Sequence, residues 1–401
     1  MSLGRRTAGL LSPWPLLAAL AFVFGGAEAI VGSAAAQPIP PQPPFDRRRE
    51  GPADSLGVWL TTVDSAVMFD PEAAARAVEL FARQGVTRVA VPIYTGGYAY
   101  WPVTTTSNPL QLAVDPRLGD PLAPTRLLRD LRQKGLQTVG WMEFGLMAPI
   151  DAPWLIGRQG LLLQDLNGQV RWSESPGLDR VWLNPALPEV RRALVALAVE
   201  ACRRLPLDAL QFDDHLGYPA RFGYDPATLA LWRATPAGRL KPQPTADDPT
   251  WLRWRAGLVT ALLAEIRQGM AKACPGVALS VSPNPMPFSL EAYLADWPSW
   301  VSAGLVDEVV VQIYRRDLGA LQGELERPSL QQAALRVPLR IGLLAGLKSA
   351  PKDPQLLQQE LELVRQRGWS GIDLFFYETA LPYLLRPTPA PTPGAESRPS
   401  P

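Results

Sequence analysis

The chain has 401 residues, 47% of them hydrophobic, which is enough for the core of one large domain or two ordinary ones. Its 39 lysine and arginine residues balance 38 aspartate and glutamate residues, so the charge gives no case for a nucleic-acid partner. His215 is the single histidine, which excludes zinc sites built from several histidines. A Ser-His-Asp triad would have to use this residue, and no Gly-x-Ser-x-Gly elbow supports one.

The first 36 residues have the features of a secretory signal peptide. Basic residues, including Arg5, precede an apolar stretch from Leu10 to Phe24, and small residues follow in an Ala-x-Ala pattern, so we expect cleavage after Ala36. The alternative is an uncleaved N-terminal anchor, although Glu28 and two glycines interrupt the apolar run before the ~20 residues that a span needs. Both interpretations predict an exported protein, periplasmic or extracellular, and only the anchor predicts a membrane contact.

Proline-rich segments flank a single folded unit. Residues 37–54 are predicted to form a Pro-rich linker, and residues 386–401 a disordered Pro-rich tail. No internal repeat or further Pro-rich break divides residues 55–385, which we therefore interpret as one domain. Cys202 and Cys274 lie near the ends of predicted helices. An exported location permits a disulfide, but we interpret both as small core residues.

Strand-like and helix-like runs alternate through this domain. Eight strands, each separated by a helix, predict an α/β fold of the (β/α)8 TIM-barrel type. An open doubly wound sheet is the alternative, but no Gly-rich phosphate turn follows the first strand. The predicted strands are Gly57–Val63, Arg88–Tyr94, Gln137–Phe144, Ala209–Asp214, Ala278–Ser282, Glu308–Tyr314, Leu339–Ala345 and Gly371–Tyr377. The predicted helices are Pro71–Gln84, Thr125–Lys134, Pro188–Arg204, Trp251–Ala273, Leu290–Ala303, Leu318–Leu335 and Gln355–Arg367.

Two long loops follow the second and third predicted strands. They comprise residues 95–121 and 146–187, and a hairpin is expected across Asn167 and Gly168. Loops after barrel strands lie on the catalytic face. Because long loops in that position are more often functional than accidental, we expect them to border the site.

The fourth predicted strand carries the candidate chemistry. Gln211 and Asp213 alternate with apolar residues, which gives the strand a polar front and an apolar back. Asp213, Asp214 and His215 stand together at its C-terminal end. The simpler alternative is an aspartate that only caps a short helix, since Asp is a common N-cap.

Polar residues at the other strand ends would converge on the same cleft of a barrel. Several carboxylates in one cleft raise each other's pKa and can supply an acid and a base at neutral pH. The alternative for any one residue is a structural ion pair, such as Lys348 with Glu378, or a cap, such as Asp64. The converging residues are Trp59, Asp64, Tyr94, Trp141, Glu143, Asn284, Gln312, Tyr314, Lys348 and Glu378.

Aromatic residues concentrate in the loop after the second strand. Tyr100 and Trp101 lie there, where core packing is less available than in a strand or helix. Flat aromatic faces beside carboxylates bind the apolar faces of sugar rings, while polar groups bind the hydroxyls. Paired carboxylates beside aromatic platforms in an exported barrel indicate cleavage of a glycosidic bond.

Several motifs, in order along the chain, resemble the bacterial glycosyl-hydrolase-like family 10 proteins. The likeness covers about Leu56 to Glu378. It implies a TIM barrel, an exported envelope protein and glycoside hydrolase activity, and some members of the family are tied to peptidoglycan glycan strands. The motifs are Gly57–Asp64, Trp182–Pro185, Pro188–Arg191, Gln211–His215, Ser280–Pro285, Asp296–Pro298, Gln312–Tyr314 and Phe375–Glu378.

These residues suggest catalytic roles. We expect Asp213 to act as nucleophile or stabilising carboxylate with Asp214 in support, Glu143 as acid/base with Glu378 in reserve, and His215 to orient a carboxylate or bind a sugar hydroxyl. A divalent metal bound by Asp213, Asp214 and Glu143 is a further alternative, because oxygen ligands suit Ca²⁺ or Mg²⁺. No other cofactor is expected, and the expected partner is a glycan polymer, with peptidoglycan as the candidate.

One departure keeps a non-catalytic function open. The fourth strand is also loosely similar to the nucleophile motif of α-amylase-type barrels, but Ser280, Ser282 and Asn284 stand on the fifth strand where those enzymes have an acid glutamate. The alternative function is therefore a glycan-binding or envelope-scaffold barrel that kept the cleft and lost a proton donor.

Overall fold

The computed structural model describes residues 55–104, 109–175 and 178–385. The predicted signal peptide or anchor, the Pro-rich linker and the Pro-rich tail (1–36, 37–54 and 386–401) lie outside the described residues. Within the described part, no helix combines the length and the hydropathy that crossing a membrane requires.

Eight parallel strands form a closed barrel, as predicted. Each strand pairs with its neighbours along the chain, and the last closes on the first, with Leu56 beside Ile372. All eight predicted strands are present, and their ends differ from the prediction by a few residues. The strands are β1 (Leu56–Trp59), β2 (Val86–Pro92), β5 (Gln137–Met142), β9 (Ala209–Asp213), β10 (Ala278–Ser282), β11 (Glu308–Gln312), β12 (Leu339–Leu344) and β15 (Ile372–Phe375).

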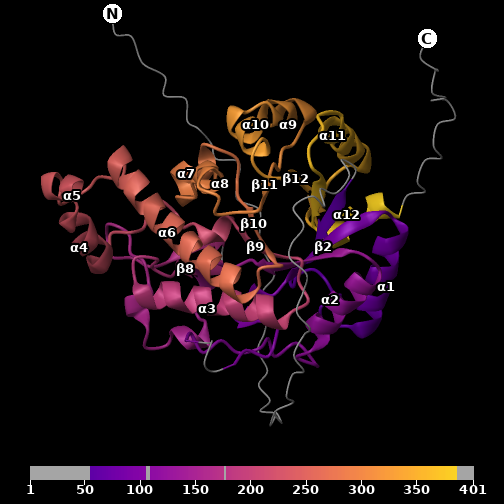
Figure 1. Cartoon of the computed structure of the whole chain (residues 1–401), viewed down its shortest axis with the longest axis horizontal. Coiled ribbons are helices and arrows are strands. Elements are labelled where there is room, and N and C mark those ends of the chain that lie inside the picture. Colours follow the sequence, from indigo (N-terminus) through magenta and orange to yellow (C-terminus); the bar gives the residue numbers. More distant parts are fainter. Residues whose placement is uncertain (1–54, 105–108, 176–177, 386–401) are drawn as a thin grey trace, which may run out of the picture.

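Helices surround the barrel (Figure 1). Asp70, Asp248 and Asp353 cap three of them, each accepting hydrogen bonds from backbone N–H groups of the first helical turn. The helices that follow the strands are α1 (Pro71–Arg83), α2 (Ala123–Gln133), α3 (Pro188–Arg204), α6 (Pro249–Ala273), α7 (Phe288–Tyr293), α8 (Trp297–Ser302), α9 (Leu318–Leu325), α10 (Pro328–Ala334), α11 (Pro354–Gln366) and α12 (Tyr377–Leu384).

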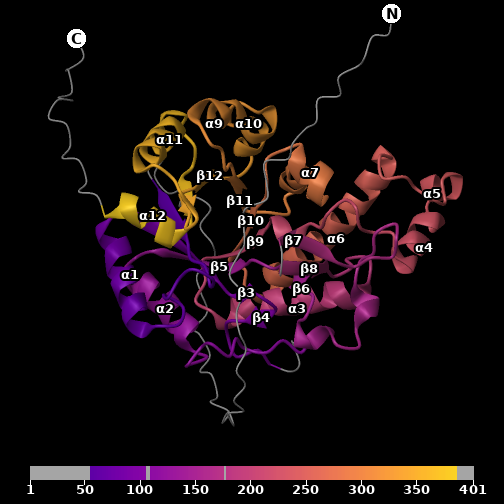
Figure 2. The same cartoon turned by 180° about the vertical axis from the view of Figure 1, so that it is seen from behind.

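Two predicted single helices are each divided in two. Leu294 adopts a left-handed conformation (φ 59°) that ends α7 before α8 begins. Pro328 stands in the first turn of α10 and cannot continue α9, because proline has no N–H for the helical ladder. The prediction missed α12, and also α4 (Pro226–Ala234) and α5 (Pro236–Leu240), which project from the barrel beside the start of α6 (Figures 1 and 2).

The two long loops carry small sheets of their own. β3 (Tyr94–Thr95) and β4 (Tyr98–Ala99) form a short hairpin after β2, and β6 (Met147–Pro149), β8 (Leu178–Trp182) and β7 (Trp172–Ser175) form a three-stranded sheet after β5. A tight turn does include Gly168 (φ 75°), but the expected hairpin is misplaced, because the paired strands are β7 and β8. A further pair, β13 (Gly346–Leu347) and β14 (Ala350–Pro351), follows β12.

The barrel interior is partly ionic. Arg88 donates two hydrogen bonds to Glu308, at 2.6 and 2.9 Å, and its Nε lies 3.5 Å from Asp373 Oδ1. Arg340 Nε donates to the other Asp373 oxygen at 2.7 Å. Burial opposes the ionisation of Glu308, but Arg88 outweighs it and lowers the pKa of that carboxyl. Gly57 is required here, because a Cβ would lie 1.6 Å from Asp373 Oδ1.

A disulfide joins two of the outer helices. Cys202 in the last turn of α3 is bonded to Cys274 at the C-cap of α6, with 6.2 Å between their Cα atoms. The disulfide that the sequence left open is thus formed, and Cys202 also lies in the core, as expected, with Cys274 packed against it. Successive helices of a barrel run in the same direction, so the C-terminal ends of α3 and α6 lie level and bring the two cysteines together.

Candidate active site

The floor of the candidate site is a chain of hydrogen bonds across the barrel. Gln211 on β9 points inward and accepts a hydrogen bond from Trp59 Nε1 at 2.9 Å. Its amide donates to Ser280 Oγ at 3.0 Å, and Ser280 Oγ donates to Glu308 at 2.8 Å. The polar face predicted for the fourth strand is thus joined to the ionic interior below it.

Asp213 lies directly above this floor, and both of its carboxylate oxygens are bonded. Oδ2 accepts from Trp141 Nε1 at 3.1 Å, and Oδ1 accepts from the His215 backbone N–H at 2.9 Å. The second bond caps a short 3₁₀ helix, η4 (Asp214–Leu216). Asp213 is therefore also the helix-capping aspartate that the sequence offered as the simpler alternative. Burial raises the pKa of Asp213, and the adjacent His215 opposes that rise.

His215 is surrounded by acceptors. Its Nδ1 lies 3.1 Å from Asp213 Oδ1 and 3.0 Å from the backbone carbonyl oxygen of Glu143, so Nδ1 carries a proton. Burial disfavours the charged ring, but the carboxylates of Asp213, Asp214 and Glu143 outweigh it and raise the pKa of His215 to about 10. The imidazole is therefore a cation at neutral pH, held against Asp213.

Asp214 is the more open of the two aspartates. Asn284 Nδ2 donates to its Oδ2 at 2.8 Å, and Gln312 Nε2 donates to its Oδ1 at 3.2 Å. Its side chain is 19% exposed, against 4% for Asp213. The ends of β9, β10 and β11 thus converge on one carboxylate, and Asn284 occupies the fifth-strand position where an acid was absent from the sequence.

Glu143 follows β5 and faces the same cluster. Burial raises its pKa, and Asp213 adds to the rise, whereas a hydrogen bond with Thr95 and the cations His215 and Arg180 oppose it. The resulting pKa is about 7, so the carboxyl is substantially protonated at neutral pH. A carboxyl that is protonated at neutral pH beside two aspartates is the arrangement that supplies a general acid.

Aromatic rings form one side of this cluster. Tyr314 stacks on Phe375, with ring centroids 5.7 Å apart, and Trp59 and Trp141 each meet Phe375 edge to face at 6.1 Å. Phe375 was not predicted as a site residue, although it belongs to the last predicted strand. The alternation of that strand, which places Phe375 and Tyr377 on the same face, was the one sequence feature that could have indicated its position.

A second group lies at the end of β1 and the start of α12. Lys348 Nζ is 2.9 Å from Asp64 Oδ1, so the ion-pair alternative holds for Lys348 and Asp64 rather than for Lys348 and Glu378. Burial raises the pKa of Glu378, whereas Ser65 and Lys348 oppose the rise. Because Ser65, Lys348 and Asp64 are its ionic and hydrogen-bonding neighbours, Glu378 belongs to this group rather than to the Asp213 cluster.

The expected platform after the second strand is not available to a ligand. Tyr100 and Trp101 are fully buried, and so is Tyr94. The β3–β4 hairpin folds back on the barrel, and the Tyr100 hydroxyl donates to Asp115, which Arg117 also binds. The position of these residues in a loop did not predict their burial, because the side chains of this loop pack into the hydrophobic core.

The arrangement gives limited support to a metal. Among the described residues, the metal-compatible group is Asp213, Asp214 and His215, whose ligand atoms lie within 4.8 Å of one another, and it differs from the expected set by replacing Glu143 with His215. The proton on His215 Nδ1, which both acceptors hold in place, would have to leave before that nitrogen could bind a cation.

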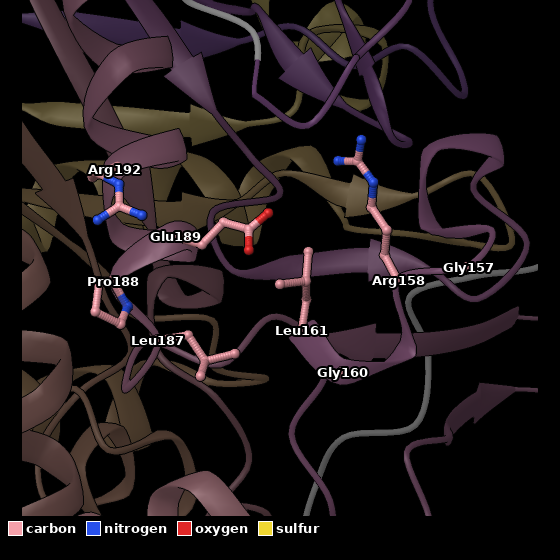
Figure 3. Close-up of a pocket in the computed structure, with 8 residues that line it drawn as sticks. All are labelled: Gly157, Arg158, Gly160, Leu161, Leu187, Pro188, Glu189 and Arg192. Carbon is pink, nitrogen blue, oxygen red and sulfur yellow. The ribbon is translucent and has the colours of Figure 1, made fainter.

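A separate hollow of about 640 Å³ opens on the surface where α3 begins (Figure 3). Residues 157–161 of the long loop after β5 form one side, and the first turn of α3 forms the other. Arg158, Glu189 and Arg192 are its charged residues. None of its lining residues belongs to the Asp213 cluster.

Comparison with known proteins gives one consistent result. The family described as glycosyl hydrolase-like 10 matches residues 55–360. Glycosyl hydrolase DigH of Escherichia coli K12 is 24% identical over 308 residues, which cover 64% of this chain and 65% of that protein, just under two thirds of its length.

Solved structures show the same fold. The glycoside hydrolase domain of PgaB (BpsB) from Bordetella bronchiseptica superposes with a TM-score of 0.57 at 14% identity, over 82% of this chain and 96% of that one. Alpha-L-fucosidase isoenzyme 2 from Paenibacillus thiaminolyticus gives a TM-score of 0.58 at 13% identity, over 82% of this chain and 48% of that one.

Proposed function

The chain belongs to the glycosyl hydrolase-like 10 family, and from this premise we propose that it is an exported glycoside hydrolase that cleaves O-glycosidic bonds of a polysaccharide. The observation that carries the proposal is the pairing of Glu143, whose pKa is about 7, with the aspartates at the end of β9. Glycoside cleavage needs one protonated and one ionised carboxyl in the same cleft.

The two kinds of carboxyl have separate roles. Glu143 gives its proton to the oxygen of the bond that breaks, which lets the leaving sugar depart as an alcohol, and a water molecule then bonds to the anomeric carbon while its proton returns to the Glu143 carboxylate. Asp214 faces the positive charge that develops at the anomeric carbon, because its carboxylate is the more open of the two. Asp213 is a positioning residue whose oxygens are occupied by Trp141 and His215. This assignment reverses the roles expected from the sequence for Asp213 and Asp214.

The polymer that we propose first is the glycan strand of peptidoglycan. Support comes from the expected export of the chain and from its likeness to a family with members tied to that polymer. The Phe375 ring cluster offers apolar faces, and the amides that bind Asp214 offer hydrogen bonds of the kind that sugar hydroxyls make.

A product analysis tests this function. The protein would be incubated with peptide-free glycan strands, intact peptidoglycan, an α-glucan and a β-glucan, and new reducing ends would be read by mass spectrometry. Asp214→Asn is expected to lower turnover by orders of magnitude, whereas Glu189→Gln, an exposed carboxylate in the hollow at α3, is expected to act as wild type. Binding to one polymer with no new reducing ends from wild-type protein would support the glycan-binding scaffold instead.

The division of roles between the aspartates has its own test. His215 is the single histidine, so its NMR titration is unambiguous. Asp213→Asn removes the carboxylate bonded to Nδ1 and is expected to lower the pKa of His215 further than Asp214→Asn does, because the Asp214 oxygen is 4.0 Å from Nδ1. A larger shift in Asp214→Asn would contradict the positioning role of Asp213.

A further inference from the structure

A buried arginine lies behind the candidate site, where α6 meets the segment that leads away from η4. Arg255 is 0% exposed and belongs to the first half of α6, beside the aromatic cluster of Tyr224, Trp232 and Trp251. The region is built from α4, α5 and the start of α6, the part that projects from the barrel in both views (Figures 1 and 2).

The guanidinium has no counter-charge. Across residues 55–104, 109–175 and 178–385, no carboxylate forms an ion pair with Arg255. Nη1 donates to the backbone carbonyls of Ala220 and Phe222, and the guanidinium carbon lies 4.7 Å from the ring centroid of Trp251. Burial lowers the pKa of Arg255, the direction expected for an uncompensated cation. Arginine nevertheless keeps its charge in proteins, so the positive charge remains.

Other donors around this charge are also unused. Arg255 Nε and Nη2 are buried and have no hydrogen-bond partner among the described residues. The same holds for the hydroxyls of Tyr218 and Tyr224 and for Trp251 Nε1. Tyr218 OH and Arg255 Nη1 flank one glycine, since a Cβ on Gly223 would lie 3.6 and 3.7 Å from them. Buried donors in folded proteins are almost always paired, so this set calls for an acceptor.

We propose that Arg255 and the donors around it bind a small monovalent anion of the halide class, such as chloride. An anion beside the guanidinium can accept from Arg255 and from Tyr218 OH, which lies on the same side of Gly223, and it cancels the buried charge, whereas a water molecule would supply an acceptor without charge. The unused atoms are enclosed, which favours a monatomic ion over a sugar acid or a phosphate group.

The anion would act on the segment that follows the candidate active site. Arg255 holds the carbonyls of Ala220 and Phe222, and Tyr218 lies three residues after His215. The backbone N–H groups of Gly223 and Tyr224 donate to the Gln164 carbonyl in the long loop after β5. Neutralising Arg255 would therefore stabilise the packing of residues 218–224 against the long loop after β5.

Thermal unfolding in different salts tests the proposal without any substrate. The protein would be exchanged into sodium gluconate, whose anion is too large to be enclosed, and titrated with sodium chloride or bromide at constant ionic strength, so that general screening does not change. At about tenfold over the dissociation constant, a bound halide is expected to raise the Tm of a domain of this size by roughly 2 °C, in a saturable manner. Equal Tm values in chloride and gluconate would overturn the proposal.

Three variants locate the response. Arg255→Met is expected to lose the halide-dependent rise, and Arg253→Met, an exposed arginine on the same helix, is expected to keep it. Tyr218→Phe removes one donor and is expected to raise the chloride midpoint severalfold, and this variant decides the matter if Arg255→Met does not fold. A halide response that persists unchanged in Tyr218→Phe, or that disappears in Arg253→Met, would place the anion elsewhere and refute the site. Because the readout is Tm, the result does not depend on whether the protein is a hydrolase.

Discussion

Substitution of Glu143 by glutamine gives the most direct measure of its unusual protonation. The pKa of Glu143 is raised from the ordinary 4.5 to about 7 by burial and by Asp213. Between these values the unfolded chain has released a proton that the folded protein still holds, so the contribution of Glu143 to wild-type stability falls as the pH rises from about 4.5 to 7. The pKa differs by about 2.5 between the folded and unfolded states, and each pKa unit corresponds to about 1.36 kcal/mol, so the loss of folding free energy is roughly 3 kcal/mol.

Glu143→Gln mimics the protonated carboxyl at every pH and is expected to escape this loss. Chemical denaturation at pH 4 and pH 8 would show nearly equal stability of the two proteins at pH 4, and an advantage of about 3 kcal/mol for the variant at pH 8. Glu189→Gln is the matched control: it keeps Glu143, so its stability is expected to follow that of the wild type, with a difference between the two proteins of less than about 0.5 kcal/mol at both pH values. A stability difference for Glu143→Gln that does not change with pH would mean that Glu143 ionises normally and is not the proton donor.

Three further predictions concern individual contacts. Trp141→Phe keeps an aromatic ring but removes the donor to Asp213, and is expected to lower kcat roughly 10- to 100-fold, because a hydrogen bond to a charged group contributes about 1.5–3 kcal/mol. Unchanged kcat would contradict the positioning role of Asp213. Arg88→Met leaves a buried carboxylate without its partner and is expected to cost about 3–5 kcal/mol in denaturant titrations, against less than ~1 kcal/mol for the more exposed Arg132→Met. Reduction of the disulfide, which closes a sequence separation of 72 residues, is expected to lower the free energy of unfolding by up to about 4 kcal/mol, and equal stability of the oxidised and reduced forms would contradict this.

The barrel could be predicted from the sequence because its strands alternate clearly. The run around Gln211 and Asp213 shows one polar and one apolar face, and glycines such as Gly135 mark where helices stop. The division of two predicted helices into α7 and α8, and into α9 and α10, was not predicted. Leu294 adopts a left-handed conformation that leucine rarely takes, so the residue type does not predict the break between α7 and α8.

The candidate site was only partly predictable. Asp213, Asp214 and His215 are adjacent in sequence, so their proximity followed from the strand, and Asn284 and Gln312 followed from the barrel. Burial was the missing information elsewhere. Tyr100, Trp101 and Tyr94 have the composition of a sugar platform, yet their hairpin packs them into the core.

The ionic interior was missed although the sequence contains a signal for it. Arg88, Glu308, Arg340 and Asp373 are charged residues inside otherwise apolar strands, two of each sign. Isolated charges rarely enter such strands unless they are paired. Four of them on separate strands therefore indicate a shared interior, but the sequence does not say which pairs meet.

This interior also bears on the order in which the chain can fold. Arg88 comes from the second strand of the barrel, while its partners Glu308 and Asp373 come from the sixth and the last. A nascent chain that ends before residue 308 holds the cation without either anion, and enclosing an unpaired charge is unfavourable by several kcal/mol. The early strands therefore gain a neutral core only once the final quarter of the polypeptide has arrived. Closure is in this sense a late and all-or-none event, and neither half of the barrel is a complete folding unit.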